Sequence, residues 1–168
     1  MGKAITARLA GGGDHVVIIG RRGRVLELAA EEMNAAGPGQ VSWQAADLSS
    51  PQDAERAAAR IEGTVDVLVN NAGGVASRGM PADRLAEVAR SWEADYKANV
   101  LSAVMLTHAL LPRLRRPGGR VVNISSIAAL RGGGGSVGEL PGFTRRILRC
   151  RPGPTGQRRS AARPPTCG

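Results

Sequence analysis

Aromatic side chains, cysteines and long apolar runs are all scarce in this chain of 168 residues. Phe, Trp and Tyr together make up 2% of the sequence, so any core must be built from Ala, Val, Leu and Ile. Both cysteines, Cys150 and Cys167, lie near the C-terminal end, which excludes a disulfide framework and a cysteine metal cluster. No stretch approaches the roughly 18 apolar residues of a membrane span, and no apolar signal segment opens the chain. We therefore expect a single-domain cytoplasmic protein without a membrane partner.

Lysine and tyrosine are also rare, and their positions matter for the chemistry. The only lysines are Lys3 and Lys97, and the only tyrosine is Tyr96. The residue four positions after Tyr96 is Val100. No Tyr-x-x-x-Lys pair can therefore be written anywhere in the sequence.

The net charge of +9 belongs mostly to the last part of the chain. Residues 1–130 contain 15 Lys and Arg against 13 Asp and Glu, a balance of +2, whereas residues 131–168 contain 8 Arg against Glu139 alone, a balance of +7. Residues 131–168 are also rich in Pro and Gly and have no apolar period. This composition predicts a mostly disordered basic tail with at most a helical turn near residues 144–148.

Short β-branched runs alternate with longer amphipathic segments in residues 1–130. The predicted strands cover 15–20, 41–46, 65–69 and 120–124. The predicted helices cover 3–10, 26–36, a segment that begins at Pro51 with Ser50 as its N-cap, about 81–91, and 93–113. This alternation predicts an α/β domain over residues 1–130, with right-handed crossovers and a parallel sheet.

Polar and glycine-containing motifs follow two of the predicted strands. Asn70-Asn71-Ala72-Gly73 follows the strand at 65–69, and Asn123-Ile124-Ser125-Ser126 ends the strand at 120–124. Asn99 lies within a predicted helix between them. Ligand sites of doubly wound sheets gather at the carboxyl ends of strands, so we expect these residues to share one site.

The order and spacing of these motifs resemble the short-chain dehydrogenase/reductase family, and the resemblance covers Met1 to about Leu130. It implies a Rossmann-type doubly wound sheet and an oxidoreductase that transfers hydride between a nicotinamide cofactor and a small carbonyl or alcohol substrate. Family members commonly associate as dimers or tetramers, so a homo-oligomer is an open expectation.

The resemblance also implies roles for individual residues. Gly2 corresponds to the last glycine of the family's phosphate-binding loop, and Asp47 and Leu48 to the pair that contacts adenine. Asn70, Asn71, Ala72 and Gly73 form the turn that supports the cofactor. Ser126 would hydrogen-bond the substrate oxygen, and Asn99 would hold a water molecule in the proton relay.

Charge after the first predicted strand favours NADP(H), with NAD(H) as the other option. NAD-using relatives typically place an acid there against the ribose 2′-hydroxyl, whereas this chain has Arg21 and Arg22. A guanidinium attracts a 2′-phosphate and can bind it with two hydrogen bonds. The alternative is that both arginines are simply solvated at the start of a helix.

Measured against the family pattern, the sequence lacks two pieces. It starts inside the glycine-rich loop, so the family's first strand has no counterpart, and Tyr-x-x-x-Lys would fall around 137–140, where the chain reads Val-Gly-Glu-Leu. In the family's strand order, the missing strand lies between the strands at 15–20 and 65–69. We therefore expect a sheet divided at its centre with two open edges, and a chain that lacks activity as it stands.

Three alternatives remain open at this point. A change of reading frame near Gly135, together with a start upstream of Met1, would explain both departures. The chain could instead be a non-catalytic binding protein whose tail contacts an anionic partner. Nucleic acid is not the expected partner, because the tail contains one aromatic residue, Phe143, and no recognisable fold. A subunit that supplies the missing pieces from another chain ranks last.

Overall fold

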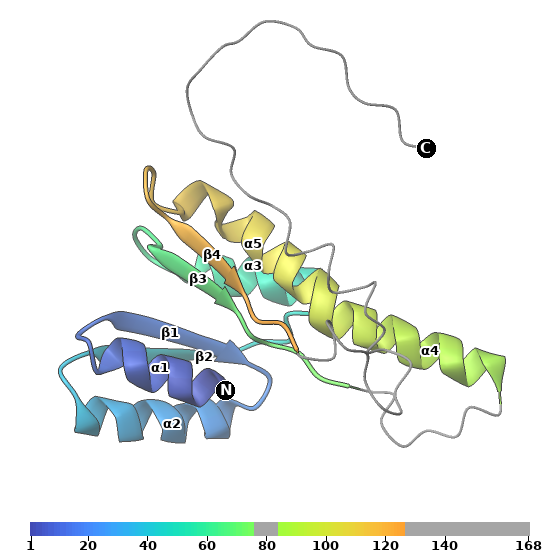
Figure 1. The fold of residues 1–168 in the computed structure, drawn as a ribbon, viewed down its shortest axis with the longest axis horizontal. Helices are drawn as coiled ribbons and strands as arrows, with labels where there is room; N and C mark the ends of the chain where they lie inside the picture. Colours follow the sequence, from blue (N-terminus) through green and yellow to red (C-terminus); the bar gives the residue numbers. More distant parts are fainter. Residues whose placement is uncertain (76–83, 127–168) are drawn as a thin grey trace, which may run out of the picture.

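The computed structural model describes residues 1–75 and 84–126, which form alternating helices and parallel strands (Figure 1). The first half contains α1 (Gly2–Ala10), β1 (His15–Gly20), α2 (Gly23–Ala36) and β2 (Gln40–Ala45). The second half contains α3 (Pro51–Ala59), β3 (Val67–Asn70), α4 (Leu85–Tyr96), the π-helical η1 (Lys97–Leu101), α5 (Ser102–Leu110), the 3₁₀-helical η2 (Leu111–Arg113) and β4 (Arg120–Asn123). The predicted α/β class is confirmed.

The strands form two separate two-stranded sheets in the described part of the chain. β1 pairs in parallel with β2, from His15 opposite Gln40 to Gly20 opposite Ala45. β3 pairs in parallel with β4, from Val67 opposite Arg120 to Asn70 opposite Asn123. The sheet is thus divided between β1 and β3, as the sequence predicts.

Two aliphatic clusters hold the fold together. One cluster lies between the first sheet and the helices α1 and α2, and its buried members are Ala10, Ala30, Met33 and Val41. The other joins the second sheet to α3 and α5, and its buried members are Leu48, Ala54, Ala57, Ala58, Leu68, Leu106 and Leu110. Ile19 of β1 packs against this second cluster, whereas Ile18 packs against the first. Successive side chains of β1 point to opposite faces of the strand, so β1 packs against both clusters.

Helix boundaries follow local sequence signals in some places and depart from the prediction in others. Ser50 caps α3 as predicted, with its hydroxyl oxygen 3.4 Å from the backbone N of Asp53. The helical character predicted for 81–91 and 93–113 is found from Leu85 onwards, but the predicted break near residue 92 is wrong, because α4, η1 and α5 follow one another without interruption from Leu85 to Leu110. No Pro or Gly interrupts these residues, so nothing in the sequence ends the helix near residue 92.

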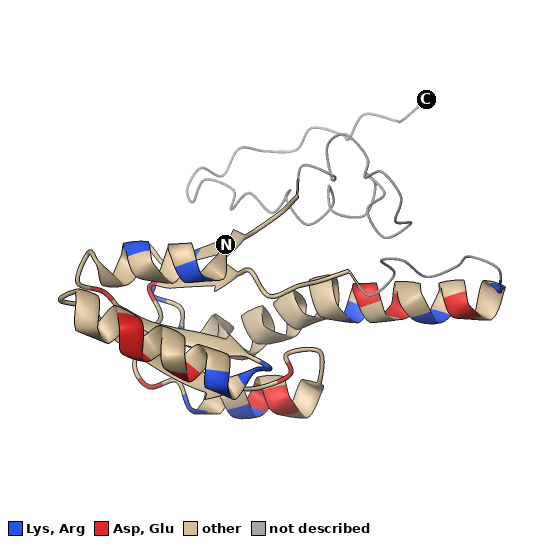
Figure 2. Cartoon of the chain, turned by 90° about the horizontal axis from the view of Figure 1, so that it is seen from below, with Lys and Arg blue, Asp and Glu red and all other residues tan. Residues whose placement is uncertain are grey.

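Charges of both signs are interspersed along α4 (Figure 2), in keeping with the near neutrality of residues 1–130. Among the described residues, no helix has the length and apolar character that crossing a membrane requires. The predicted tail at 131–168 and its helical turn near 144–148 lie outside the described residues.

Candidate cofactor-binding site

A cavity of about 590 Å³ lies at the carboxyl ends of β1, β2 and β3. Six residues singled out from the sequence line it, namely Arg21, Arg22, Asp47, Leu48, Ala72 and Gly73. They come from three separate loops, each of which follows a strand. The fold therefore brings together residues that are up to 52 positions apart, from Arg21 to Gly73, at the edge where doubly wound sheets bind ligands.

Arg21 and Arg22 occupy the turn between β1 and α2. Both side chains are exposed, and Arg22 is the N-cap residue of α2. Gly23, the first helical residue, lies against the Trp43 ring, because a Cβ atom there would be 3.4 Å from the ring. The short turn thus places both arginines in the lining of the cavity, beside the amino end of α2, which also favours anions.

The Asp47 carboxylate is held in place by Ser49, two residues further along the same loop. Its Oδ1 accepts a hydrogen bond of 2.6 Å from the Ser49 hydroxyl and one of 3.0 Å from the Ser49 backbone N–H. The Ser49 hydroxyl and backbone N–H, aided by the charge of Arg21, hold the pKa of Asp47 below its ordinary value. The carboxylate is therefore ionised and fixed at neutral pH. Ser49, which also lines the cavity, was not identified from the sequence.

Leu48 has a largely structural position. Its side chain is only 8% exposed and belongs to the cluster that contains Ala54 and Leu68. It also lines the cavity, as does its neighbour Asp47, which carries a charge. An aliphatic wall beside a fixed carboxylate suits a flat, partly polar ring such as adenine.

Asn70 braces the end of β3 against two other elements. Its Nδ2 donates to Thr107 Oγ1 of α5 at 3.0 Å and to Asn123 Oδ1 of β4 at 2.8 Å. The sequence pattern identified Asn70 and Asn123 but not Thr107. The signal that could have identified Thr107 is its polar side chain at a helix position where the spacing predicts an apolar residue.

Two close approaches fix the turn after β3. A Cβ atom on Gly2 would lie 2.9 Å from Asn71 Nδ2, and one on Gly73 would lie 2.5 Å from Asn99 Oδ1. Gly2 therefore seats the start of α1 against the turn, and Gly73 lets Asn99 approach it. Gly2 and Asn71 do not line the cavity; they support the turn that does.

Asn99 uses its side chain to clamp this turn. Its Oδ1 accepts from the backbone N of Gly74 at 3.0 Å, and its Nδ2 donates to the backbone O of Gly74 at 2.7 Å and of Asp95 at 2.8 Å. The π-helical segment η1 carries Asn99, and such segments mark sites where a helix is locally re-aimed. The side-chain amide thus positions the glycine turn, and the predicted water-holding role stays a prediction.

Ser126 lies just beyond β4, at the same edge of the second sheet. The backbone N of Ile124 donates to the backbone O of Asn70. The hydrogen bonds between β3 and β4 therefore extend to a point two residues before Ser126. Ser126 is exposed and is not part of the cavity lining. The structure therefore places Ser126 near the edge that carries Asn70 and Asn123 but does not bring it into the cavity with Arg21 and Asp47.

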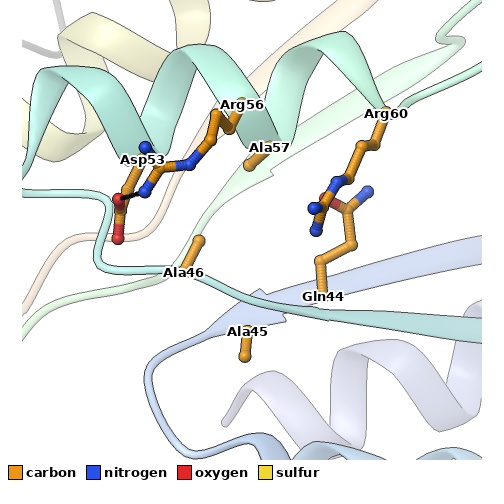
Figure 3. Close-up of a pocket in the computed structure, with 7 residues that line it drawn as sticks. All are labelled: Gln44, Ala45, Ala46, Asp53, Arg56, Ala57 and Arg60. Carbon is orange, nitrogen blue, oxygen red and sulfur yellow. Dashed lines mark hydrogen bonds and ion pairs between the residues drawn. The ribbon is translucent and has the colours of Figure 1, made fainter.

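A second, much smaller cavity of about 40 Å³ lies between β2 and α3 (Figure 3). Arg60 and Gln44 line it, together with Arg56, which forms an ion pair with Asp53. The Gln44 Oε1 atom is buried without a hydrogen-bond partner. A cavity of this volume has room for a few water molecules and is far too small for a nucleotide.

The fold and the large cavity define the class of the protein: a dinucleotide-binding α/β fold in which ligand-facing residues gather at the carboxyl ends of parallel strands. Residues 1–137 match the short chain dehydrogenase family. The chain belongs to this family.

Known relatives support this assignment. Serine 3-dehydrogenase of Agrobacterium fabrum is 35% identical over 131 residues, which cover 76% of this chain and 50% of that protein. An NADH-dependent reductase solved with NAD has a TM-score of 0.74 at 26% identity, covering 87% of this chain and 63% of its own. The Pseudomonas aeruginosa RhlG/NADP active-site complex also has a TM-score of 0.74, at 28% identity, and covers 87% and 59%. The chain spans about half the length of the curated relatives it matches.

Proposed function

We propose that this chain binds a nicotinamide dinucleotide in the large cavity and prefers NADP(H) to NAD(H). The observation that carries the proposal is the convergence of Arg21, Arg22 and Asp47 on one cavity mouth. The fixed Asp47 carboxylate and the Leu48 wall would hold adenine, and the two guanidinium groups would bind the 2′-phosphate. Solved relatives complexed with NAD and with NADP support the choice of ligand class.

The reaction that the family assignment suggests is hydride transfer with a small carbonyl or alcohol substrate, in which the bound cofactor would supply hydride to the carbonyl or accept it from the alcohol. The Asn99 clamp on Gly74 would orient the turn that borders the cofactor, and Ser126 would hydrogen-bond the substrate oxygen. The printed sequence offers no Tyr-x-x-x-Lys pair to donate and accept the proton. We therefore propose that the chain as given binds cofactor without turnover.

The preference for a 2′-phosphate is tested by titrating the chain with NADPH and NADH and following nicotinamide fluorescence. We expect Arg21→Ala combined with Arg22→Ala to weaken NADPH binding by about tenfold to a hundredfold, since hydrogen bonds to charged groups contribute about 1.5–3 kcal/mol. NADH binding should change by less than about threefold. Arg90→Ala, on the exposed face of α4, is the matched control.

Equal losses for both cofactors would contradict the 2′-phosphate assignment, and no binding of either would contradict the site itself. Turnover is measured separately as NADPH oxidation with a panel of small aldehydes and ketones. Turnover that is abolished by Ser126→Ala would contradict the proposed lack of activity and would place Ser126 in the catalytic machinery.

A further inference from the structure

Asp53, in the first turn of α3, joins that helix to the loop that carries Asp47. Its Oδ2 accepts a hydrogen bond of 3.1 Å from the backbone N–H of Asp47, and its Oδ1 forms the ion pair with Arg56. Figure 3 shows Asp53 beside the loop that leads from Ala46 into α3. One carboxylate thus connects a helix to the backbone of a residue that lines the large cavity.

The loop that begins at Ala46 is attached to the rest of the fold at three successive residues. The backbone N–H of Ala46 donates to the backbone O of Gly20 at 2.9 Å, next to Arg21. The backbone N–H of Asp47 donates to Asp53, and the side chain of Leu48 is buried in the cluster of the second sheet. Of these three attachments, the bond to Asp53 acts directly on the backbone of Asp47.

Asp53 belongs to a well-fixed part of the fold. Its neighbour Ala54 is 1% exposed and lies in the same buried cluster as Leu48. The Ser50 hydroxyl accepts from the backbone N–H of Asp53, which caps the first turn of the helix. A carboxylate on a packed and capped helix can hold the loop backbone in one place.

Fixing the backbone of Asp47 also fixes the direction of its side chain. Both hydrogen bonds from Ser49 end on Oδ1 of Asp47, and within the described residues no other hydrogen bond reaches this carboxylate. Oδ2 can therefore accept from a ligand in the cavity. A carboxylate only accepts hydrogen bonds, and adenine carries an exocyclic amino group that donates them. The direction of Oδ2 thus depends on Ser49 through the side chain and on Asp53 through the backbone.

We propose that Asp53 is a positioning residue for the adenine group of the cofactor. By accepting from the Asp47 N–H, it directs the Asp47 carboxylate towards the adenine amino group. This inference rests on the proposed function and adds to it a residue outside the lining of the large cavity. Asp53 acts through Asp47 and makes no contact of its own with the nucleotide.

The test titrates the full chain with NADPH and with its hypoxanthine analogue, in which a carbonyl oxygen replaces the adenine amino group. A carboxylate attracts the amino group and repels the carbonyl oxygen, so the wild type should bind NADPH about tenfold to a hundredfold more tightly. Asp53→Ala should reduce this ratio to less than about threefold. A smaller folded fraction weakens both titrations by the same factor, so the ratio reports the direction of Asp47 rather than the stability of the chain.

Three further variants make the result specific. Asp53→Asn keeps an oxygen that can accept from the Asp47 N–H, so its ratio should stay within about threefold of the wild-type value. Glu55→Ala is the matched control and should leave the ratio unchanged, since Glu55 is an exposed acid on the same helix. In an Asp47→Ala background the ratio should be close to one, and Asp53→Ala should not change it further, which a double-mutant cycle measures.

The inference is overturned if Asp53→Ala retains the wild-type ratio, or if Asp53→Asn or Glu55→Ala lowers it as much as Asp53→Ala does. It is also overturned if Asp53→Ala changes the ratio in the Asp47→Ala background. In each of these cases the wild type still binds NADPH, so the proposed function stands. A wild type that binds both nucleotides equally overturns the inference alone, because Asp47 then does not contact the amino group. A wild type that binds neither nucleotide overturns the proposed function as well.

Discussion

The two halves of the molecule contribute different things to the candidate site. The half built on β1 and β2 supplies the charged groups, Arg21 and Arg22 after β1 and Asp47 after β2. The half built on β3 and β4 supplies uncharged braces, in which Asn70 joins three elements and Asn99 clamps the glycine turn. Recognition and positioning thus come from separate sheets, so the site depends on how the two sheets are held together.

The apolar cover of the two sheets also differs. In the first sheet, Val16 and Ile18 pack against the cluster formed with α1 and α2. In the second sheet, Leu68 is buried, but Val67, Val121 and Val122 are 43%, 39% and 41% exposed. The second sheet thus depends more heavily on one face, which packs on α3 and α5. Substitutions in the two clusters should therefore have unequal effects.

The largest effect is expected in the cluster of the second sheet. Leu110 is 1% exposed, and Leu110→Ala should lower the free energy of unfolding by about 3–4 kcal/mol because it leaves a cavity in the layer that supports β3. Met33→Ala in the other cluster should lower it by about 2 kcal/mol. Urea unfolding followed by far-UV circular dichroism measures both losses. Leu85→Ala is the control, because the Leu85 side chain is 88% exposed. Equal losses at Leu110 and Met33 would remove the distinction between the two halves.

The next effect concerns the glycine turn. Gly73→Ala should lower the free energy of unfolding by about 1–3 kcal/mol, because the new methyl group would be 2.5 Å from Asn99 Oδ1. Gly74→Ala is the matched control, since a Cβ atom there has nothing within 4 Å. In an Asn99→Ala background the Gly73→Ala loss should largely disappear, and a double-mutant cycle measures this coupling. Additive losses would show that the close approach to Asn99 is not the cause.

The smallest effect concerns Asp47 in the half that supplies charge. Ser49→Ala should lower the free energy of unfolding at pH 7 by about 1 kcal/mol, less than usual for a bond to a charged group because the carboxylate is partly exposed. The pKa of Asp47 is lowered in the folded chain, so the stability it contributes is present above the unfolded pKa near 3.9 and is lost as the pH falls through the lower folded value.

The difference between wild type and Ser49→Ala should therefore be constant from pH 7 to about pH 5 and shrink towards pH 3. Urea unfolding across this range measures it, and in an Asp47→Asn background the substitution should show no such pH dependence. A difference that stays constant down to pH 3 would mean that the Ser49 hydroxyl acts on something other than the Asp47 charge.

Much of the fold could be predicted because the local signals were strong. The β-branched run at 15–20, the Ser50 cap and the aliphatic composition predicted β1, the start of α3 and the nature of both clusters. The helix boundary near residue 92 could not be predicted correctly, because helical spacing alone does not show whether two amphipathic segments are joined. The π-helical segment at Lys97–Leu101, which carries the Asn99 that contacts Gly74, has no sequence signal of this kind.

Part of the candidate site could likewise be predicted from the sequence, and part could not. The sequence motifs identified Arg21, Asp47 and Gly73, which the structure brings to one cavity, and Ser126, predicted to contact the substrate, which lies outside the cavity lining. Ser49 and Thr107 were missed, because short polar residues beside a motif are common and only contacts show that they hold Asp47 and Asn70.

The sequence by itself determined the family, the parallel α/β pattern, the aliphatic core and the two arginines after β1, because spacing, periodicity and charge are properties of the chain before it folds. Only the tertiary structure decided that Asn99 clamps a glycine turn and that Ser49 fixes the Asp47 carboxylate. The first depends on a contact between residues 25 positions apart, and the second on the direction of a side chain within a short turn. Packing sets both.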